Sequence, residues 1–245
     1  MPPTVRADQA APPCNNPDEL TRLASPLSRV ARRIAAGKPI TVVAIGSSST
    51  AGAGASSPAG SYPSRLEVEL KSQLRGHGVT VINRGVNGEE IADMLKRFDE
   101  AVVANKPDLV LWQLGTNSVI RDQSVSSNGA LIRAGIRKVR AIGADVVLID
   151  PQYAPKVIAK PDAERAVEFL AATAKQENVD LFRRYDVMKR WYQVDRIGFD
   201  TFVAPDGLHL NDWSYACMAR GLGQAIAEAA QRPVMSATAV HYPGP

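Results

Sequence analysis

A run of small and hydroxyl-bearing residues, Gly46-Ser47-Ser48-Ser49-Thr50-Ala51-Gly52, directly follows a β-branched apolar run and contains three serines that could serve as nucleophiles. A serine in a sharp turn before a helix lies near backbone N–H groups, which can stabilise a developing oxyanion. A serine hydroxyl also needs a base to take its proton when it attacks. The run is equally consistent with a flexible Gly/Ser loop, so its chemistry depends on a partner elsewhere in the chain.

That partner is found near the other end of the chain, in Asp206-Gly207-Leu208-His209. A three-residue offset on a turn can place a carboxylate beside an imidazole. The carboxylate then holds the ring tautomer, and the other ring nitrogen faces a nucleophile. Of the other two histidines, His77 lies in a glycine-flanked turn and His241 near the end of the chain. If a general base is needed, His209 is the well-placed one.

Two further turns carry groups that can donate hydrogen bonds, Asn83-Arg84-Gly85-Val86-Asn87-Gly88 and Gly115-Thr116-Asn117-Ser118. Gly85 could bring a backbone N–H close to a substrate, and the Asn117 amide could donate beside it. Each segment taken singly is consistent with an ordinary turn. The combination with the serine run and the Asp/His pair is what indicates a site.

The elements that must position these turns alternate along the chain. Apolar runs typical of strands buried on both faces of a parallel sheet cover residues 40–45, 79–83, 109–114, 145–149 and 179–182. Segments with helical periodicity cover residues 18–35, 62–75, 89–98, 129–142, 162–176 and 212–230. This alternation predicts right-handed crossovers and a three-layer α/β/α sandwich. Ligands in such sheets bind beyond the carboxyl ends of the strands, where these turns begin.

The ordered set Ser48, Gly85, Asn117 and His209 resembles the SGNH hydrolases, the GDSL-like esterase superfamily, over roughly residues 40–211. The resemblance implies a flavodoxin-like five-stranded parallel sheet in the order 2-1-3-4-5. It also implies ester hydrolysis through an acyl-enzyme with no metal and no other cofactor. Two positions depart from the usual family pattern, because Ser47 and Ser118 stand where aspartates are common.

Residue by residue, the resemblance makes Ser48 the nucleophile, His209 its base and Asp206 the group that orients the base. The oxyanion hole would consist of the backbone N–H groups of Ser48 and Gly85 with the Asn117 side chain. The serine run leaves Ser47 and Ser49 as groups that could stand in for Ser48 in a variant.

We expect a serine esterase acting on small, acetyl-type esters, with an O-acylated carbohydrate as the substrate. The same resemblance covers lysophospholipases, thioesterases and acyltransferases that act on glycans. Four aromatic residues just before the Asp/His turn could wall a sugar or acyl site, or could simply pack the last helix onto the sheet: Trp191, Tyr192, Phe199 and Phe202.

Two non-enzymatic interpretations remain for comparison. A catalytically silent glycan-binding domain would not need serine, aspartate and histidine together. A nucleotide-binding flavodoxin-like protein would share the fold, but the first loop has no Walker lysine and its glycines at 52, 54 and 60 miss the dinucleotide-binding spacing.

Composition excludes several other classes. The chain has 245 residues, 45% apolar and 22% charged, which suits one soluble globular domain. Its net charge of +4 comes from scattered basic residues without an aromatic-rich module, so we expect no nucleic-acid partner. No apolar stretch approaches the roughly 18 residues of a membrane span.

We divide the chain into an N-terminal arm at 1–17, one domain at 18–231 and a flexible tail at 232–245. Cys14 and Cys217 lack metal-site spacing, so they are two buried thiols or one long-range disulfide that ties the arm to the helix after His209. Disulfides persist in oxidising compartments. We therefore expect a periplasmic or secreted protein, with a cytoplasmic location as the alternative, and leave the oligomeric state open.

Overall fold

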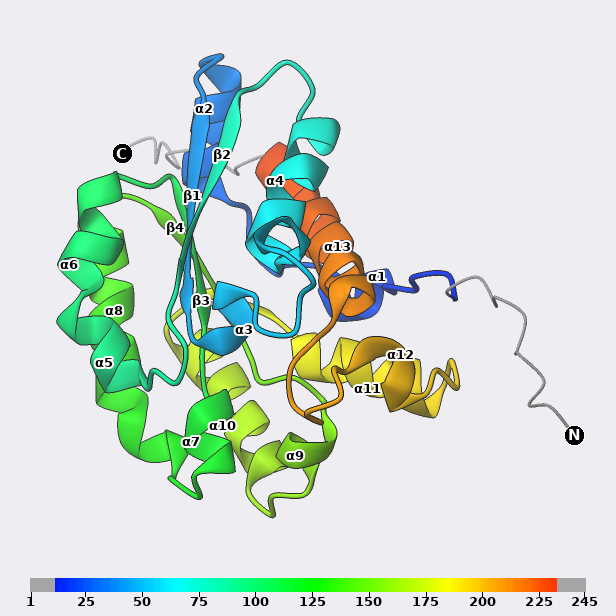
Figure 1. The fold of residues 1–245 in the computed structure, drawn as a ribbon. Helices are drawn as coiled ribbons and strands as arrows, with labels where there is room; N and C mark the ends of the chain where they lie inside the picture. Colours follow the sequence, from blue (N-terminus) through cyan, green and yellow to red (C-terminus); the bar gives the residue numbers. More distant parts are fainter. Residues whose placement is uncertain (1–11, 233–245) are drawn as a thin grey trace, which may run out of the picture.

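The computed structural model describes residues 12–232, which form one five-stranded sheet covered by helices (Figure 1). The strands are β1 (Ile40–Gly46), β2 (Val79–Gly85), β3 (Leu109–Gln113), β4 (Asp145–Ile149) and β5 (Asp180–Phe182). Every neighbouring pair is parallel, and the order is β2-β1-β3-β4-β5. The predicted sandwich and strand order are therefore confirmed.

The degree to which each strand is buried explains its amino-acid composition. Every residue of β3 is buried, and β1 is buried except for its partly exposed Thr41, because both strands have neighbours on each side and helices above and below. β2 forms one edge of the sheet and is largely half-exposed, so its run contains the polar residues Asn83 and Arg84. The two central strands thus provide a rigid platform whose carboxyl ends carry the serine and asparagine turns.

Helices form a layer on each face of the sheet (Figure 1). On one face lie α4 (Tyr62–Gln73) and α13 (Asp212–Gln231), which pack against each other; on the other lie α5 (Ile91–Lys96), α6 (Phe98–Ala101) and α8 (Gly129–Ala141). α10 (Ala163–Gln176) connects β4 to β5. Within residues 12–232, no helix is long and apolar enough to cross a membrane.

The predicted continuous helix at 18–35 is wrong, because the segment is broken into α1 (Asp18–Thr21) and α2 (Ser28–Ala35). Pro26 lies in the break, and proline disfavours helical geometry in the residue before it. The Asp180 carboxylate accepts hydrogen bonds from two backbone N–H groups of the break, and the Asp145 carboxylate accepts two from the first turn of α2. The segment is thus anchored where β4 and β5 begin.

Several short elements were not predicted. Three helices begin just beyond strands, α3 (Ser48–Ala51), α7 (Thr116–Ile120) and α9 (Pro155–Ile158), and two lie between β5 and α13, α11 (Arg184–Gln193) and α12 (Phe199–Phe202). Single 3-10 turns occur at Pro58–Gly60, Val103–Asn105 and Val125–Asn128. Such short helices carry too few residues to show a period in the sequence.

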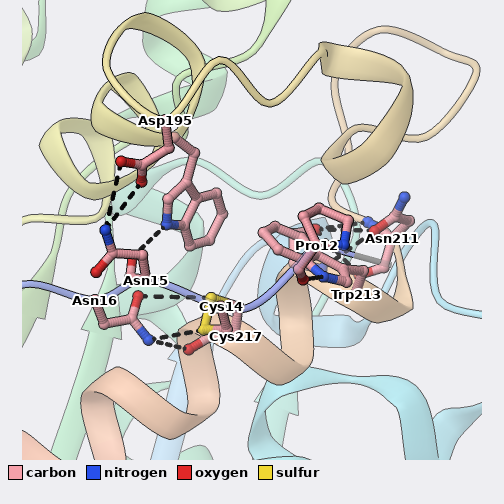
Figure 2. The surroundings of a disulfide bond; sticks show 10 residues. Pro12, Cys14, Asn15, Asn16, Asp195, Asn211, Trp213 and Cys217 are labelled. Carbon is pink, nitrogen blue, oxygen red and sulfur yellow. Dashed lines mark hydrogen bonds between the residues drawn. A yellow bond between two sulfur atoms is a disulfide. The ribbon is translucent and has the colours of Figure 1, made fainter. Parts of the chain in front are cut away.

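Residues 12–17 lie against the C-terminal half of the fold (Figure 2). Cys14 and Cys217 form a disulfide with their Cα atoms 5.4 Å apart. Asn16 Nδ2 donates to the Cys217 carbonyl at 2.8 Å, and the indole N–H groups of Trp191 and Trp213 donate to backbone carbonyls of the arm. The described part of the arm is therefore held to both α11 and α13. The division into arm, domain and tail remains a prediction, since residues 1–11 and 233–245 lie outside the described range.

Candidate active site

Ser48 and His209, which are 161 positions apart in the chain, lie within hydrogen-bonding distance of each other. Ser48 is the first residue of α3, two positions beyond the last residue of β1. Its Oγ lies 2.8 Å from Nε2 of His209, and Nδ1 of His209 lies 2.5 Å from Oδ2 of Asp206. The three side chains thus form one hydrogen-bonded line, in the arrangement that a general base and its orienting carboxylate require.

The Asp206 carboxylate is held by its own turn. Its Oδ1 accepts hydrogen bonds at 2.9 Å from the backbone N–H groups of both Leu208 and His209, and Gly207 adopts a φ of 69° that glycine tolerates readily. Partial burial raises the pKa of Asp206, but the bonds from the His209 ring and from the two N–H groups outweigh it. The pKa therefore lies below its ordinary value, and Asp206 is an anion at neutral pH.

The two serines beside Ser48 are turned into the protein. Ser47 is 2% exposed and its Oγ donates to Oε1 of Gln113 at 3.0 Å. Ser49 is 1% exposed, and its Oγ has no hydrogen-bond partner within residues 12–232. Of the three serines, Ser48 is the one whose hydroxyl contacts the histidine. This arrangement disfavours replacement of Ser48 by either neighbour.

The residues predicted to form the oxyanion hole lie on neighbouring strands. Gly85 ends β2 opposite Gly46, and a Cβ at Gly85 would overlap the backbone of α3, so only glycine allows this approach. Its N–H donates to Oδ1 of Asn83 at 2.8 Å. Asn117, in α7, donates one amide hydrogen to the Glu89 carbonyl at 2.8 Å and has a second hydrogen left to donate.

The two departures from the usual family pattern have local explanations. Ser118 Oγ donates to the Glu90 carboxylate at 2.6 Å, and Arg121 pairs with the same carboxylate at 2.8 Å. An aspartate at position 118 would face Glu90 with a like charge. At position 47, both the N–H and the hydroxyl donate to the Gln113 oxygen. An aspartate carboxylate only accepts hydrogen bonds, so it could not replace the hydroxyl in this contact.

The aromatic residues before the Asp/His turn divide into two groups. Trp191 and Phe202 are fully buried, and Trp191 packs edge-on against Trp213 of α13 with ring centroids 5.1 Å apart. These two residues therefore have the packing role, which was one of the two alternatives for the aromatic cluster. Phe199 stacks on the 40% exposed Tyr192 at 4.2 Å and lines an open cavity of about 410 Å³ beside the Asp206 turn. Of the four aromatic residues, Phe199 is the one that lines this cavity, so it alone among them is placed to wall a ligand site.

Two buried glutamines next to the site, Gln113 and Gln152, were not among the predicted site residues. Gln113 ends β3 inside an otherwise apolar run, and Gln152 follows β4 by three positions. A polar residue within a buried strand must find hydrogen-bond partners. The glutamine within the apolar run at 109–114 could therefore have indicated a buried hydrogen-bond network.

Comparison with known proteins agrees with this architecture. A variant of the acetylxylan esterase from Geobacillus stearothermophilus superposes with a TM-score of 0.66 at 19% identity, covering 78% of this chain and 95% of that chain. A two-domain esterase active on acetylated mannans superposes with a TM-score of 0.72 at 20% identity, covering 92% of this chain and 60% of that one. At these identities the likeness shows the fold.

Sequence comparison reaches a few characterised relatives. The acetylxylan esterase of G. stearothermophilus is 27% identical over 86 residues, which span 31% of this chain and 39% of that protein. Esterase TesA of Pseudomonas aeruginosa is 28% identical over 145 residues, 58% of this chain and 68% of that protein.

A sequence match to a lipase-like family, in agreement with the strand order, confirms the predicted superfamily, the SGNH or GDSL-like hydrolases. Residues 13–232 match the model of the non-GDSL lipase-like family. The chain belongs to that family.

Proposed function

We propose that this protein is a carboxylic-ester hydrolase in which Ser48, His209 and Asp206 form the catalytic triad. The observation that carries the proposal is the continuous line from Ser48 Oγ through the His209 ring to the Asp206 carboxylate, with distances of 2.8 and 2.5 Å. The esterase names of the relatives at 27–28% identity support the same reaction class.

The reaction begins when His209 Nε2 takes the Ser48 proton as the hydroxyl oxygen attacks the ester carbonyl. The tetrahedral intermediate collapses to an acyl-enzyme as His209 gives that proton to the departing alcohol. A water molecule then loses a proton to His209 and attacks the acyl carbonyl, which releases the acid and restores Ser48. Asp206, as an anion, stabilises the imidazolium that forms in each half of the cycle.

The oxyanion accepts hydrogen bonds from the Ser48 N–H, the Gly85 N–H and the free amide hydrogen of Asn117. Ser48 lies in the first turn of α3, where backbone N–H groups have no partner within the helix. The Gly85 N–H must exchange its bond to Asn83 for one to the oxyanion. Asn117 is already oriented by the Glu89 carbonyl, so it requires no such exchange.

For the substrate we propose a small acyl group on an O-acylated carbohydrate. The open cavity beside the Asp206 turn is lined by the half-buried Phe199, and aromatic side chains are common in the walls of ligand sites. Named relatives include an esterase acting on xylan acetyl groups and one active on acetylated mannans. The disulfide supports a periplasmic or secreted location.

The test measures acetate and succinate release from a panel of acylated glycans, with Ser48→Ala beside the wild type. Release of acid from a glycan by the wild type alone is the expected result. A series of p-nitrophenyl esters of increasing chain length distinguishes this specificity from a lysophospholipase or thioesterase, whose rate rises with chain length. Product analysis with a sugar acceptor present would reveal acyl transfer.

A fluorophosphonate probe distinguishes the enzyme from a silent glycan-binding domain. The folded wild type should be labelled at Ser48, and Ser48→Ala should not. Absence of labelling in folded wild type, together with no ester hydrolysis, would contradict the proposed function.

A further inference from the structure

A line of buried polar side chains runs beneath the candidate site, from the turn that carries Ser48 to the turn that carries His209. Its five members come from four segments of the chain and are all at most 3% exposed: Ser47, Gln113, Thr116, Gln152 and Arg184. No step of the proposed mechanism uses them. Buried polar groups are costly unless paired, so a line of this length in the core needs an explanation.

The half of this line next to Ser48 is built on Gln113. Its Oε1 accepts hydrogen bonds from the backbone N–H of Ser47 at 2.9 Å and from the Ser47 hydroxyl at 3.0 Å. Gly46 permits this contact, because a Cβ there would overlap the Gln113 side chain. The residue immediately before the nucleophile is thus fixed to the end of β3.

The half next to His209 is built on Gln152. Its Oε1 accepts from Thr116 Oγ1 at 2.9 Å and from Nη2 of Arg184 at 2.9 Å. Its Nε2 donates to the carbonyl of Leu208 at 3.1 Å. The N–H of Leu208 already donates to Asp206, so the residue before His209 is held at both its N–H and its carbonyl.

The direction of every bond in the line follows from two groups that can only donate. The Ser47 N–H requires an oxygen, so Gln113 presents Oε1 to it and Nε2 to the Thr116 hydroxyl, 3.4 Å away. The guanidinium of Arg184 likewise requires the oxygen of Gln152, which leaves Nε2 for the Leu208 carbonyl. Thr116, accepting from one glutamine, donates to the other. The line has one consistent hydrogen-bond pattern and does not depend on an arbitrary choice of amide orientation.

We infer that Gln152 is a positioning residue for hydrolysis, which sets the distance between His209 and Ser48 by fixing the Leu208 carbonyl to the same network that holds Ser47. This inference rests on the proposed function. Displacement of a catalytic group by about 1 Å can lower a rate by about a hundredfold. Gln152 itself contacts neither Ser48 nor His209, so it acts through the peptide before the base.

Gln152→Glu tests this role with almost no change in shape. The variant keeps an oxygen for Thr116 and Arg184 but replaces the donor with an acceptor facing the Leu208 carbonyl. We expect kcat for p-nitrophenyl acetate to fall by about tenfold with KM within about twofold of wild type. Labelling by the fluorophosphonate should slow by the same factor, because it also depends on His209. A merely structural role would lower the melting temperature and leave kcat of the folded protein unchanged.

Gln176→Glu, an exposed position in α10, makes the same chemical change outside the network and should behave as wild type. Gln152→Met, which adds no charge, carries the same expectation of lower kcat at constant KM if Gln152→Glu does not fold. Wild-type kcat in either folded variant would overturn the inference. So would failure of both variants to fold, since Gln152 would then hold the fold and not the histidine turn.

These outcomes are separable from failure of the proposed function. A wild type that neither hydrolyses esters nor accepts the probe would contradict the triad itself. A Ser48-dependent activity that Gln152→Glu leaves intact would contradict only the positioning role.

Discussion

The two ends of the candidate triad are held in different ways. Ser48 follows a central strand, its neighbours Ser47 and Ser49 are buried, and its turn is bonded to the end of β3. His209 lies in a turn before α13 whose Asp206 side chain is 43% exposed. The sheet places the nucleophile, whereas hydrogen bonds between the side chains of Asp206 and Gln152 and the backbone of residues 208 and 209 place the base. Changes at the two ends should therefore have different consequences for activity and stability.

Removal of the nucleophile should have the largest effect. Ser48→Ala is expected to lower kcat for p-nitrophenyl acetate by a factor on the order of thousands, because no neighbouring hydroxyl contacts His209. The melting temperature should stay close to that of wild type. The exposed Ser57→Ala serves as the control. Near-normal turnover by Ser48→Ala would show that the turn after β1 does not carry the nucleophile.

Loss of the carboxylate at the other end should have a smaller but still large effect. Asp206→Asn is expected to lower kcat by a factor on the order of hundreds to thousands, because a neutral amide does not stabilise the imidazolium and can fix the wrong ring tautomer. Steady-state kinetics at constant pH give the value. Retention of more than half of wild-type kcat would show that the histidine turn positions its ring without the carboxylate.

Asp206 also makes the stability of the folded protein depend on pH. The pKa of Asp206 is lowered in the folded state, so its contribution is fully present above the ordinary aspartate value of about 3.9 and is lost as the pH falls through the lower folded value. Urea unfolding between about pH 5 and pH 2 should show a weaker loss of stability in Asp206→Asn than in wild type. Parallel curves for the two proteins would contradict this linkage.

The disulfide should affect stability far more than chemistry. Reduction, or the variant Cys14→Ser, is expected to lower the free energy of unfolding by about 2–5 kcal/mol, because the bond joins residues 203 positions apart and anchors the arm to α13. kcat measured well below the melting temperature should change by less than about threefold. A large loss of kcat in the folded, reduced protein would instead show that the arm helps hold the histidine turn.

Ser49→Ala should have the smallest effect. The Ser49 hydroxyl is buried and has no hydrogen-bond partner in the described part of the chain, so its removal is expected to leave stability unchanged or raise it by about 1 kcal/mol, with normal kcat. Ser47→Ala, which loses a bond to Gln113, is the matched comparison and should be destabilised. Equal stability of the two variants would contradict the difference assigned to these neighbouring serines.

Much of the architecture was accessible without a structure. The five apolar runs correspond to the five strands, most clearly for the interior strands β1, β3 and β4, because strands buried on both faces are nearly continuously apolar. The order of the motifs was enough to predict the superfamily. The helix at 18–35 was mispredicted, since its break is fixed by Pro26 and by carboxylates from distant strands. The aromatic cluster could not be divided in advance, because only packing distinguishes the buried Trp191 from the exposed Tyr192.

Residue type and spacing along the chain were enough to predict the sheet, the superfamily and the candidates Ser48, Asp206 and His209. Which atoms meet depends on how the segments pack in three dimensions. The tertiary structure showed that the Gly85 N–H is bonded to Asn83, that Cys14 pairs with Cys217, and that Gln113 and Gln152 join the two turns. The contacts of the two glutamines join strands and loops that are far apart in the chain, so no local pattern predicts them. The disulfide was one of two alternatives for the cysteines, and the packing of the arm on α13 distinguishes them.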